Sequence, residues 1–76
     1  MTYEEYFELV KEGLDFYLRP YKLSDAEIIK YMLSQEDVIR ENYEKDNKDY
    51  ELGKITLRQF REGGVSGVVY TLHLLY

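Results

Sequence analysis

Hydrophobic residues recur every three or four positions through the first fifty residues of the chain. This spacing places them on one face of an α-helix, whereas a half-buried strand would alternate every second position. The apolar positions are Tyr3, Phe7, Val10, Leu14 and Tyr17 in a first segment, Ile28, Ile29 and Met32 in a second, and Ile39, Tyr43 and Tyr50 in a third. Pro20 ends the first segment, and Gly53 follows the third, where a left-handed C-terminal cap is expected. The pattern predicts three amphipathic helices.

Helix starts are marked by a repeated pattern in which Ser or Thr precedes an acid or amide by three positions, with hydrophobic residues on either side. This is a capping box with a hydrophobic staple. Its hydroxyl residues are Thr2, Ser24, Ser34 and Thr56. We therefore predict four helix starts, with a break between the second and third helices near Leu33–Ser34. The phase of the apolar positions also permits one continuous helix from residue 24 to about residue 50.

The last fourteen residues, 63–76, carry no formal charge. A helix over this tail has an apolar face made of Val65, Val68, Val69, Leu72, Leu75 and Tyr76. It is apolar on nearly all sides, so it belongs in the middle of a bundle. Gly63, Gly64 and Gly67 would form a hinge before it and let it approach a neighbouring backbone closely. A strand is the alternative, because the tail also alternates and carries a β-branched pair; it would pair with residues 54–60.

These elements predict an all-α fold, a compact bundle of four to five short helices with the apolar C-terminal helix as its core. The alternative is an α+β fold with a C-terminal β-hairpin. The 76 residues form a single domain, 1–76. A chain this short buries only about 60% of its unfolded surface, and without cysteine no disulfide adds stability. A homodimer could supply the missing burial.

The net charge of −5 argues against nonspecific attraction to nucleic acid or anionic lipid, because both need positive charge. No stretch reaches the ~20 apolar residues of a membrane span. The N-terminal segment is acidic, unlike a signal peptide. The sequence therefore predicts a cytoplasmic protein without membrane contact.

Motifs for catalysis or cofactor binding are weak. Residues 46–60 resemble the turn of an EF-hand calcium loop, but Lys48, Tyr50 and Leu52 stand where calcium needs anionic oxygens. The glycine-rich run at 62–67 lacks the lysine of a phosphate-binding loop, and His73 is the only histidine. We predict no catalytic, metal or cofactor site, and hence a protein that is not an enzyme.

Two acidic stripes lie on the predicted outer faces of the first and third helices. Their members, the candidate partner-binding residues, are Glu5, Glu8, Glu12 and Asp15 on the first helix and Asp37, Glu41 and Glu44 on the third. Such stripes are commonly solvated faces. The sharper interpretation is that they imitate a phosphate backbone and occupy the basic groove of a nucleic-acid-binding protein. Nine tyrosines add candidate interface anchors.

A candidate basic edge, Lys54, Arg58 and Arg61, gives a competing interpretation. In a helix-turn-helix protein such residues would contact phosphates or guanine. The preceding helix, however, holds seven acids and three bases between residues 36 and 51, and this field repels a duplex. Direct nucleic-acid binding is therefore the less favoured hypothesis.

The C-terminal run GKITLRQFREGGVSGVVYTLHLLY, a third of the chain, resembles the end of short, uncharacterised accessory proteins of phages and mobile elements of Gram-positive bacteria. Some small acidic proteins of this kind resemble anti-CRISPR or anti-restriction inhibitors in size and charge. The resemblance implies a non-enzymatic protein that acts by protein–protein binding, such as an inhibitor that mimics nucleic acid and blocks a host defence nuclease. A small DNA-binding regulator and a homo-oligomeric structural protein are the alternatives.

Overall fold

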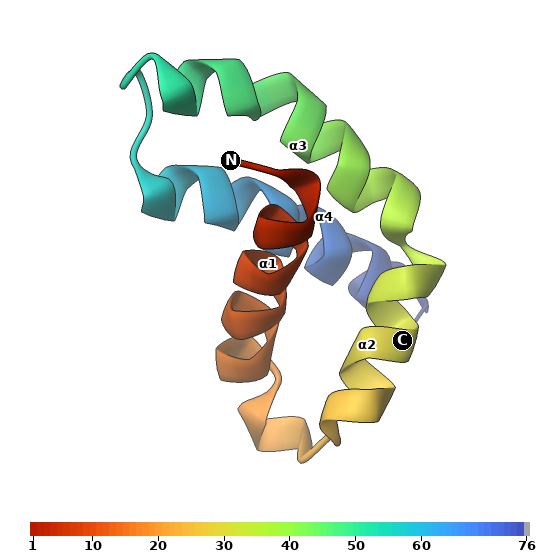
Figure 1. Cartoon of the computed structure of the whole chain (residues 1–76). Coiled ribbons are helices and arrows are strands. Elements are labelled where there is room, and N and C mark those ends of the chain that lie inside the picture. Colours follow the sequence, from red (N-terminus) through yellow and green to blue (C-terminus); the bar gives the residue numbers. More distant parts are fainter. Residues whose placement is uncertain (76) are drawn as a thin grey trace.

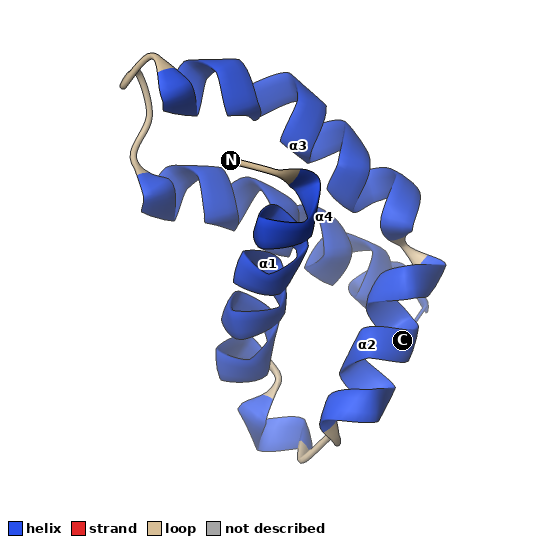
Figure 2. Ribbon diagram, viewed as in Figure 1, coloured by secondary structure: helices blue, strands red, loops and turns tan. Residues whose placement is uncertain are grey.

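The computed structural model describes residues 1–75, with side chains for residues 1–70. Four α-helices and one short 3₁₀-helix make up this part of the chain (Figure 1). They are α1 (Tyr3–Tyr17), η1 (Arg19–Tyr21), α2 (Asp25–Ser34), α3 (Glu36–Glu51) and α4 (Leu57–Leu75). The predicted all-α bundle is confirmed, and the alternative β-hairpin is wrong, because residues 1–75 contain no strand (Figure 2).

Helix α4 is the element around which the others are arranged. It runs back beside α3, and α1 crosses in front of α4 in this view (Figure 1). Helix α2 packs on α1 and α3, and the Tyr31 hydroxyl of α2 donates a hydrogen bond to the Val68 carbonyl of α4 at 3.4 Å. The prediction that the C-terminal helix forms the core is confirmed, with Phe60, Val65 and Val68 all buried.

Three of the four predicted capping boxes form. The amide nitrogens of Glu5, Glu27 and Gln59 donate to the hydroxyls of Thr2, Ser24 and Thr56, and the acid or amide side chains accept from the capping residues' own amides. Each box satisfies amide groups that a helix start otherwise leaves without a partner. These hydroxyl residues therefore fix where α1, α2 and α4 begin.

The fourth predicted box, at Ser34, is wrong, although the break beside it is confirmed. Ser34 is the last residue of α2, and its hydroxyl donates to the Tyr31 carbonyl at 2.6 Å. Gln35 separates the two helices and gives α3 no side-chain cap. The hydroxyl bonds backwards to its own helix, which is the common alternative for serine inside a helix.

The end of α3 follows the predicted glycine cap. Gly53 has a φ of +76°, a conformation that glycine adopts without strain. The amides of Lys54 and Gly53 donate to the carbonyls of Asp49 at 2.8 Å and Tyr50 at 3.1 Å. These two bonds form a Schellman motif, which ends α3 and turns the chain toward α4.

The buried line of α1 differs from the predicted face. It consists of Tyr6, Val10 and Leu14, whereas Tyr3 and Phe7 lie at its margin and Tyr17 is 43% exposed. The Tyr6 ring stacks on Phe60 with ring centroids 4.4 Å apart, and its hydroxyl donates to the Phe60 carbonyl at 3.0 Å. This contact with α4 rotates α1 so that Tyr6 faces the centre of the core.

The predicted glycine hinge is also wrong, because α4 continues without a break through residues 63–67. The segments predicted as a fourth helix start and a separate tail helix are one helix. The predicted close approach does occur. A Cβ atom on Gly64 would lie 2.5 Å from the Tyr6 hydroxyl and 2.7 Å from a Val10 methyl, so only glycine fits against α1 at this point.

Parts of the predicted tail face lie outside the described side chains, namely Leu72, Leu75 and Tyr76, and so does His73. Within the described part, Val65 and Val68 are buried, Val69 is half-buried and Tyr70 is 67% exposed.

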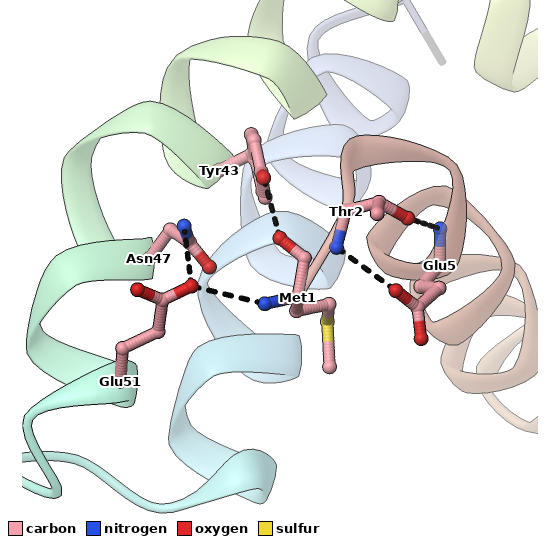
Figure 3. A network of polar contacts seen from close by, with 6 residues as sticks. All are labelled: Met1, Thr2, Glu5, Tyr43, Asn47 and Glu51. Atoms are coloured by element: carbon pink, nitrogen blue, oxygen red, sulfur yellow. Dashed lines mark hydrogen bonds and ion pairs between the residues drawn. The ribbon is translucent and has the colours of Figure 1, made fainter.

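The N-terminal segment is tied to α3 by polar contacts (Figure 3). The Met1 amine forms an ion pair with Glu51 at 3.1 Å, and the Asn47 side chain donates to the same carboxylate oxygen at 3.3 Å. The Tyr43 hydroxyl donates to the Met1 carbonyl at 2.5 Å. These contacts hold the start of α1 against α3.

Candidate partner-binding surface

The acidic stripe of α1 is exposed, but its four members are not equivalent. Glu5, Glu8 and Glu12 are exposed, whereas Asp15 is half-buried and forms an ion pair with Lys11 at 3.1 Å. Glu5 is engaged in the capping box, and the hydrogen bonds that its carboxylate accepts from the backbone and side chain of Thr2 lower its pKa. The carboxylates of this stripe that lie open to a partner are therefore Glu8 and Glu12.

The acidic stripe of α3 lies on the side of the helix that faces away from the core. Asp37, Glu41 and Glu44 are all exposed, and Lys48 continues the same face toward the end of the helix. Among the side chains of residues 1–70, no lysine or arginine comes within ion-pair distance of these three carboxylates. Their negative charge is therefore directed to solvent.

The structure does not join the two stripes into one surface. Helix α1 meets α3 through its first turns, where the Tyr3 and Tyr6 rings contact the Tyr43 ring at centroid distances of 5.7 and 5.6 Å. Beyond this contact the two helices diverge (Figure 1). Residues 1–70 therefore present no single straight row of carboxylates that could follow one phosphate strand. The two stripes lie on separate surfaces of the protein.

An open groove lies where α1 meets the junction of α2 and α3, and sequence reasoning did not find it. It has a volume of about 390 Å³ and is lined by Tyr3, Glu4, Phe7, Glu8, Leu33, Glu36 and Arg40. Its floor contains the Tyr3 and Phe7 rings, with centroids 6.2 Å apart, and Leu33 is 56% exposed beside them. Of the predicted partner-binding residues, only Glu8 lines this groove.

Charged residues surround this apolar floor. The Arg40 guanidinium lies 4.1 Å from the centroid of the Tyr3 ring and donates to Glu36 at 2.8 Å. Burial, and next the charge of Glu36, raises the pKa of the Tyr3 hydroxyl. The hydrogen bond to Glu36 raises the pKa of Arg40, which therefore stays charged. The groove combines aromatic surface with carboxylates, an arrangement that suits a cation with an apolar stem.

The predicted basic edge does not form a continuous basic face. Lys54 lies in the turn before α4, Arg58 is exposed on the first turn, and Arg61 is half-buried with Glu62 3.8 Å away. The exposed residues of α4 within residues 57–70 are Leu57, Arg58, Gln59, Glu62, Ser66 and Tyr70, so Arg58 is the one cation among them. A recognition helix needs cations on the face it turns to DNA, so this placement does not favour the DNA-binding hypothesis.

The described residues contain no group of three or more His, Cys, Asp or Glu side chains placed to hold a metal ion. Within the same part of the chain, no helix has the length and hydropathy needed to cross a bilayer. Comparison of the chain with protein-family models, curated proteins and solved structures found no match. Its class is therefore defined by architecture alone, that of a small acidic four-helix protein with a charged, partly apolar surface.

Proposed function

We propose that this protein acts by binding a basic surface of another protein and catalyses no reaction. The observation that carries the proposal is the solvent-directed stripe Asp37, Glu41 and Glu44, whose carboxylates form no ion pair with the side chains of residues 1–70. Carboxylates held on a rigid helix keep their charge available for a partner, because no internal ion pair must first be broken.

The sharper form of the proposal is an inhibitor that mimics nucleic acid and blocks a nuclease, as the resemblance to mobile-element accessory proteins implies. Nuclease surfaces that bind DNA are strongly basic, because much of the affinity comes from phosphate contacts. An acidic helix face competes for the same cations. The two stripes of this protein diverge, so each would contact a separate basic patch of the partner.

The test is charge reversal on α3. Asp37, Glu41 and Glu44 are changed to lysine together, and a control changes only Glu62, an exposed acid on the outward face of α4. We expect the triple variant to lose the proteins that the wild type captures from the source cell at low salt, and the control to keep them. Captured proteins should also be displaced by duplex DNA, because both ligands use the same basic surface.

Both variants should keep the fold, because all four side chains lie outside the core, and far-ultraviolet circular dichroism checks this. Capture that is unchanged by the triple reversal would exclude the acidic face of α3 as the binding surface. Capture that is lost in the variant but unaffected by duplex DNA would exclude nucleic-acid mimicry and leave protein binding in place.

A further inference from the structure

The groove between α1 and the α2–α3 junction already contains one bound guanidinium, which belongs to the protein itself. Arg40 lies over the Tyr3 ring at 4.1 Å and donates to Glu36 at 2.8 Å. The aromatic face attracts the cation and the carboxylate accepts its N–H groups, the two interactions that arginine makes best. One half of the groove therefore shows how an arginine is recognised on this surface.

The other half of the groove repeats these parts without a cation. Phe7 supplies the second aromatic ring, Leu33 supplies apolar surface, and Glu4 and Glu8 supply two exposed carboxylates. Among the side chains of residues 1–70, no lysine or arginine pairs with Glu4 or Glu8. Three carboxylates against one guanidinium (Glu4, Glu8 and Glu36 against Arg40) leave this groove with a charge of −2.

We propose that this groove binds an arginine side chain of the partner, with its aliphatic stem against Phe7 and Leu33 and its guanidinium between Glu4 and Glu8. The proposal rests on the proposed function, because it names one contact through which a basic partner would be held. Charge complementarity selects a basic occupant, and the aromatic and apolar floor selects one with a planar cation and a long apolar stem. Arginine meets both requirements, whereas the compact, strongly hydrated ammonium of lysine meets them less well.

The volume of the groove agrees with this occupant. At about 390 Å³ it lies at the lower end of the roughly 300–1,000 Å³ typical of small-ligand sites. The groove is open to solvent, with Glu4, Glu8, Leu33 and Arg40 of its lining exposed, so a side chain can enter without displacing a helix.

The test measures binding of a blocked hexa-arginine peptide by nuclear magnetic resonance, with hexa-lysine and hexa-citrulline as comparison peptides. The binding variant combines Glu4→Gln and Glu8→Gln. The control combines Asp25→Asn and Glu62→Gln, which removes the same charge from exposed positions outside the groove and outside both acidic stripes. Both variants therefore keep the same net charge and nearly the same long-range field.

We expect hexa-arginine to bind more tightly than hexa-lysine, and hexa-citrulline not to bind. The resonances that shift should include those of Phe7 and Leu33. Loss of both groove carboxylates should weaken hexa-arginine binding by roughly tenfold, and the control should weaken it less than about twofold. A further variant, Leu33→Ser, should weaken binding without any change of charge.

Equal losses in the binding variant and the control, or equal affinity for hexa-lysine, would overturn the groove proposal. Because the peptide would still bind an acidic face in that case, the proposed function would stand. Shifts confined to Asp37, Glu41 and Glu44 would likewise place the contact on α3 and overturn the groove. Absence of hexa-arginine binding at low salt would count against both proposals together.

Discussion

Replacement of Gly64 by alanine tests the packing of α4 against α1, on which the shape of the bundle depends. In the middle of a helix, alanine is more favourable than glycine by about 0.5–1 kcal/mol. At Gly64 a methyl group would instead lie 2.5 Å from the Tyr6 hydroxyl oxygen and 2.7 Å from Val10 Cγ2. Neither distance is compatible with van der Waals contact, so the helices must move apart or Tyr6 must rotate.

Tyr6 has little freedom to rotate. Its side chain is fully buried, its ring stacks on Phe60, and its hydroxyl is hydrogen-bonded to the Phe60 carbonyl. Overpacking of this kind costs about 1–3 kcal/mol, which exceeds the gain in helix propensity. We therefore expect Gly64→Ala to lower the free energy of unfolding by about 1–2 kcal/mol. Each kcal/mol corresponds to a decrease in melting temperature of about 4–8 °C.

The neighbouring glycine supplies a matched control on the same turn of α4. A methyl group at Gly63 would lie 3.2 Å from Asp46 Oδ2 and 3.4 Å from Asn42 Oδ1, the ends of two side chains that can move by a few tenths of an ångström. Gly63→Ala should therefore keep most of the propensity gain and stabilise the protein by about 0.5 kcal/mol.

The assay is urea unfolding followed by circular dichroism, with equal m-values required for the comparison. A third variant, Gly64→Ala combined with Tyr6→Phe, removes the hydroxyl oxygen nearest to the new methyl group. The effect of Gly64→Ala should be smaller in this background than in the wild type. The packing would be refuted if Gly64→Ala were as stable as Gly63→Ala.

Three further predictions follow from the polar contacts. Burial raises the pKa of Tyr6 to about 12, so its hydroxyl stays protonated in the folded protein after unfolded tyrosine begins to ionise near pH 10. The free energy of unfolding should therefore fall between about pH 10 and 12. Urea unfolding at pH 9 and 11 should show a smaller fall in Tyr6→Phe. Ser24→Ala should lower the free energy of unfolding by about 1 kcal/mol because it removes a helix cap. Ser34→Ala should change the free energy of unfolding by less than about 0.5 kcal/mol. Equal losses in the two variants would contradict the assigned helix starts. The hydrogen bond from the Met1 amine lowers the pKa of Glu51, so the stabilising contribution of this ion pair is present at neutral pH and is lost as the pH falls through the pKa of Glu51 in the folded protein. Glu51→Gln should therefore reduce the loss of stability at acid pH. An unchanged loss would contradict the ion pair of Figure 3.

Much of the fold could be predicted because its signals are local. The hydroxyl and acid of each capping box lie three residues apart, so Thr2, Ser24 and Thr56 could be read directly from the sequence. The role of Gly53 as the C-terminal cap of α3 could also be predicted, since a left-handed cap favours glycine. Ser34 has the same pattern, but its hydroxyl bonds to Tyr31 within its own helix, and sequence alone does not decide between the two partners.

The features that could not be predicted depend on contacts between distant segments. Tyr6 is not among the apolar positions predicted for the first helix, because nothing local shows that Phe60 stacks on it. Gly64 was interpreted as a hinge residue, because its role depends on the Tyr6 and Val10 side chains of another helix. Without the fold, Gly63, Gly64 and Gly67 could not be distinguished from a hinge.

The candidate site was predicted only in part for the same reason. Exposure of the acidic stripes followed from helical periodicity, and Glu8, Glu12, Asp37, Glu41 and Glu44 are all exposed. The groove brings Phe7 of α1 beside Leu33 and Arg40, which lie at the α2–α3 break. Only the packing of α1 against α2 and α3 creates the groove, and the sequence contains no signal for this packing.

The central claim is that exposed carboxylates on a rigid helical bundle bind a basic partner. Its most direct test is the association rate constant with a captured partner, measured by stopped-flow between about 50 and 500 mM salt, because added ions screen attraction between exposed charges. The account predicts a steep decrease with salt in the wild type, and a low, nearly constant rate when Asp37, Glu41 and Glu44 are replaced by lysine. A wild-type rate that does not change across this range would contradict it.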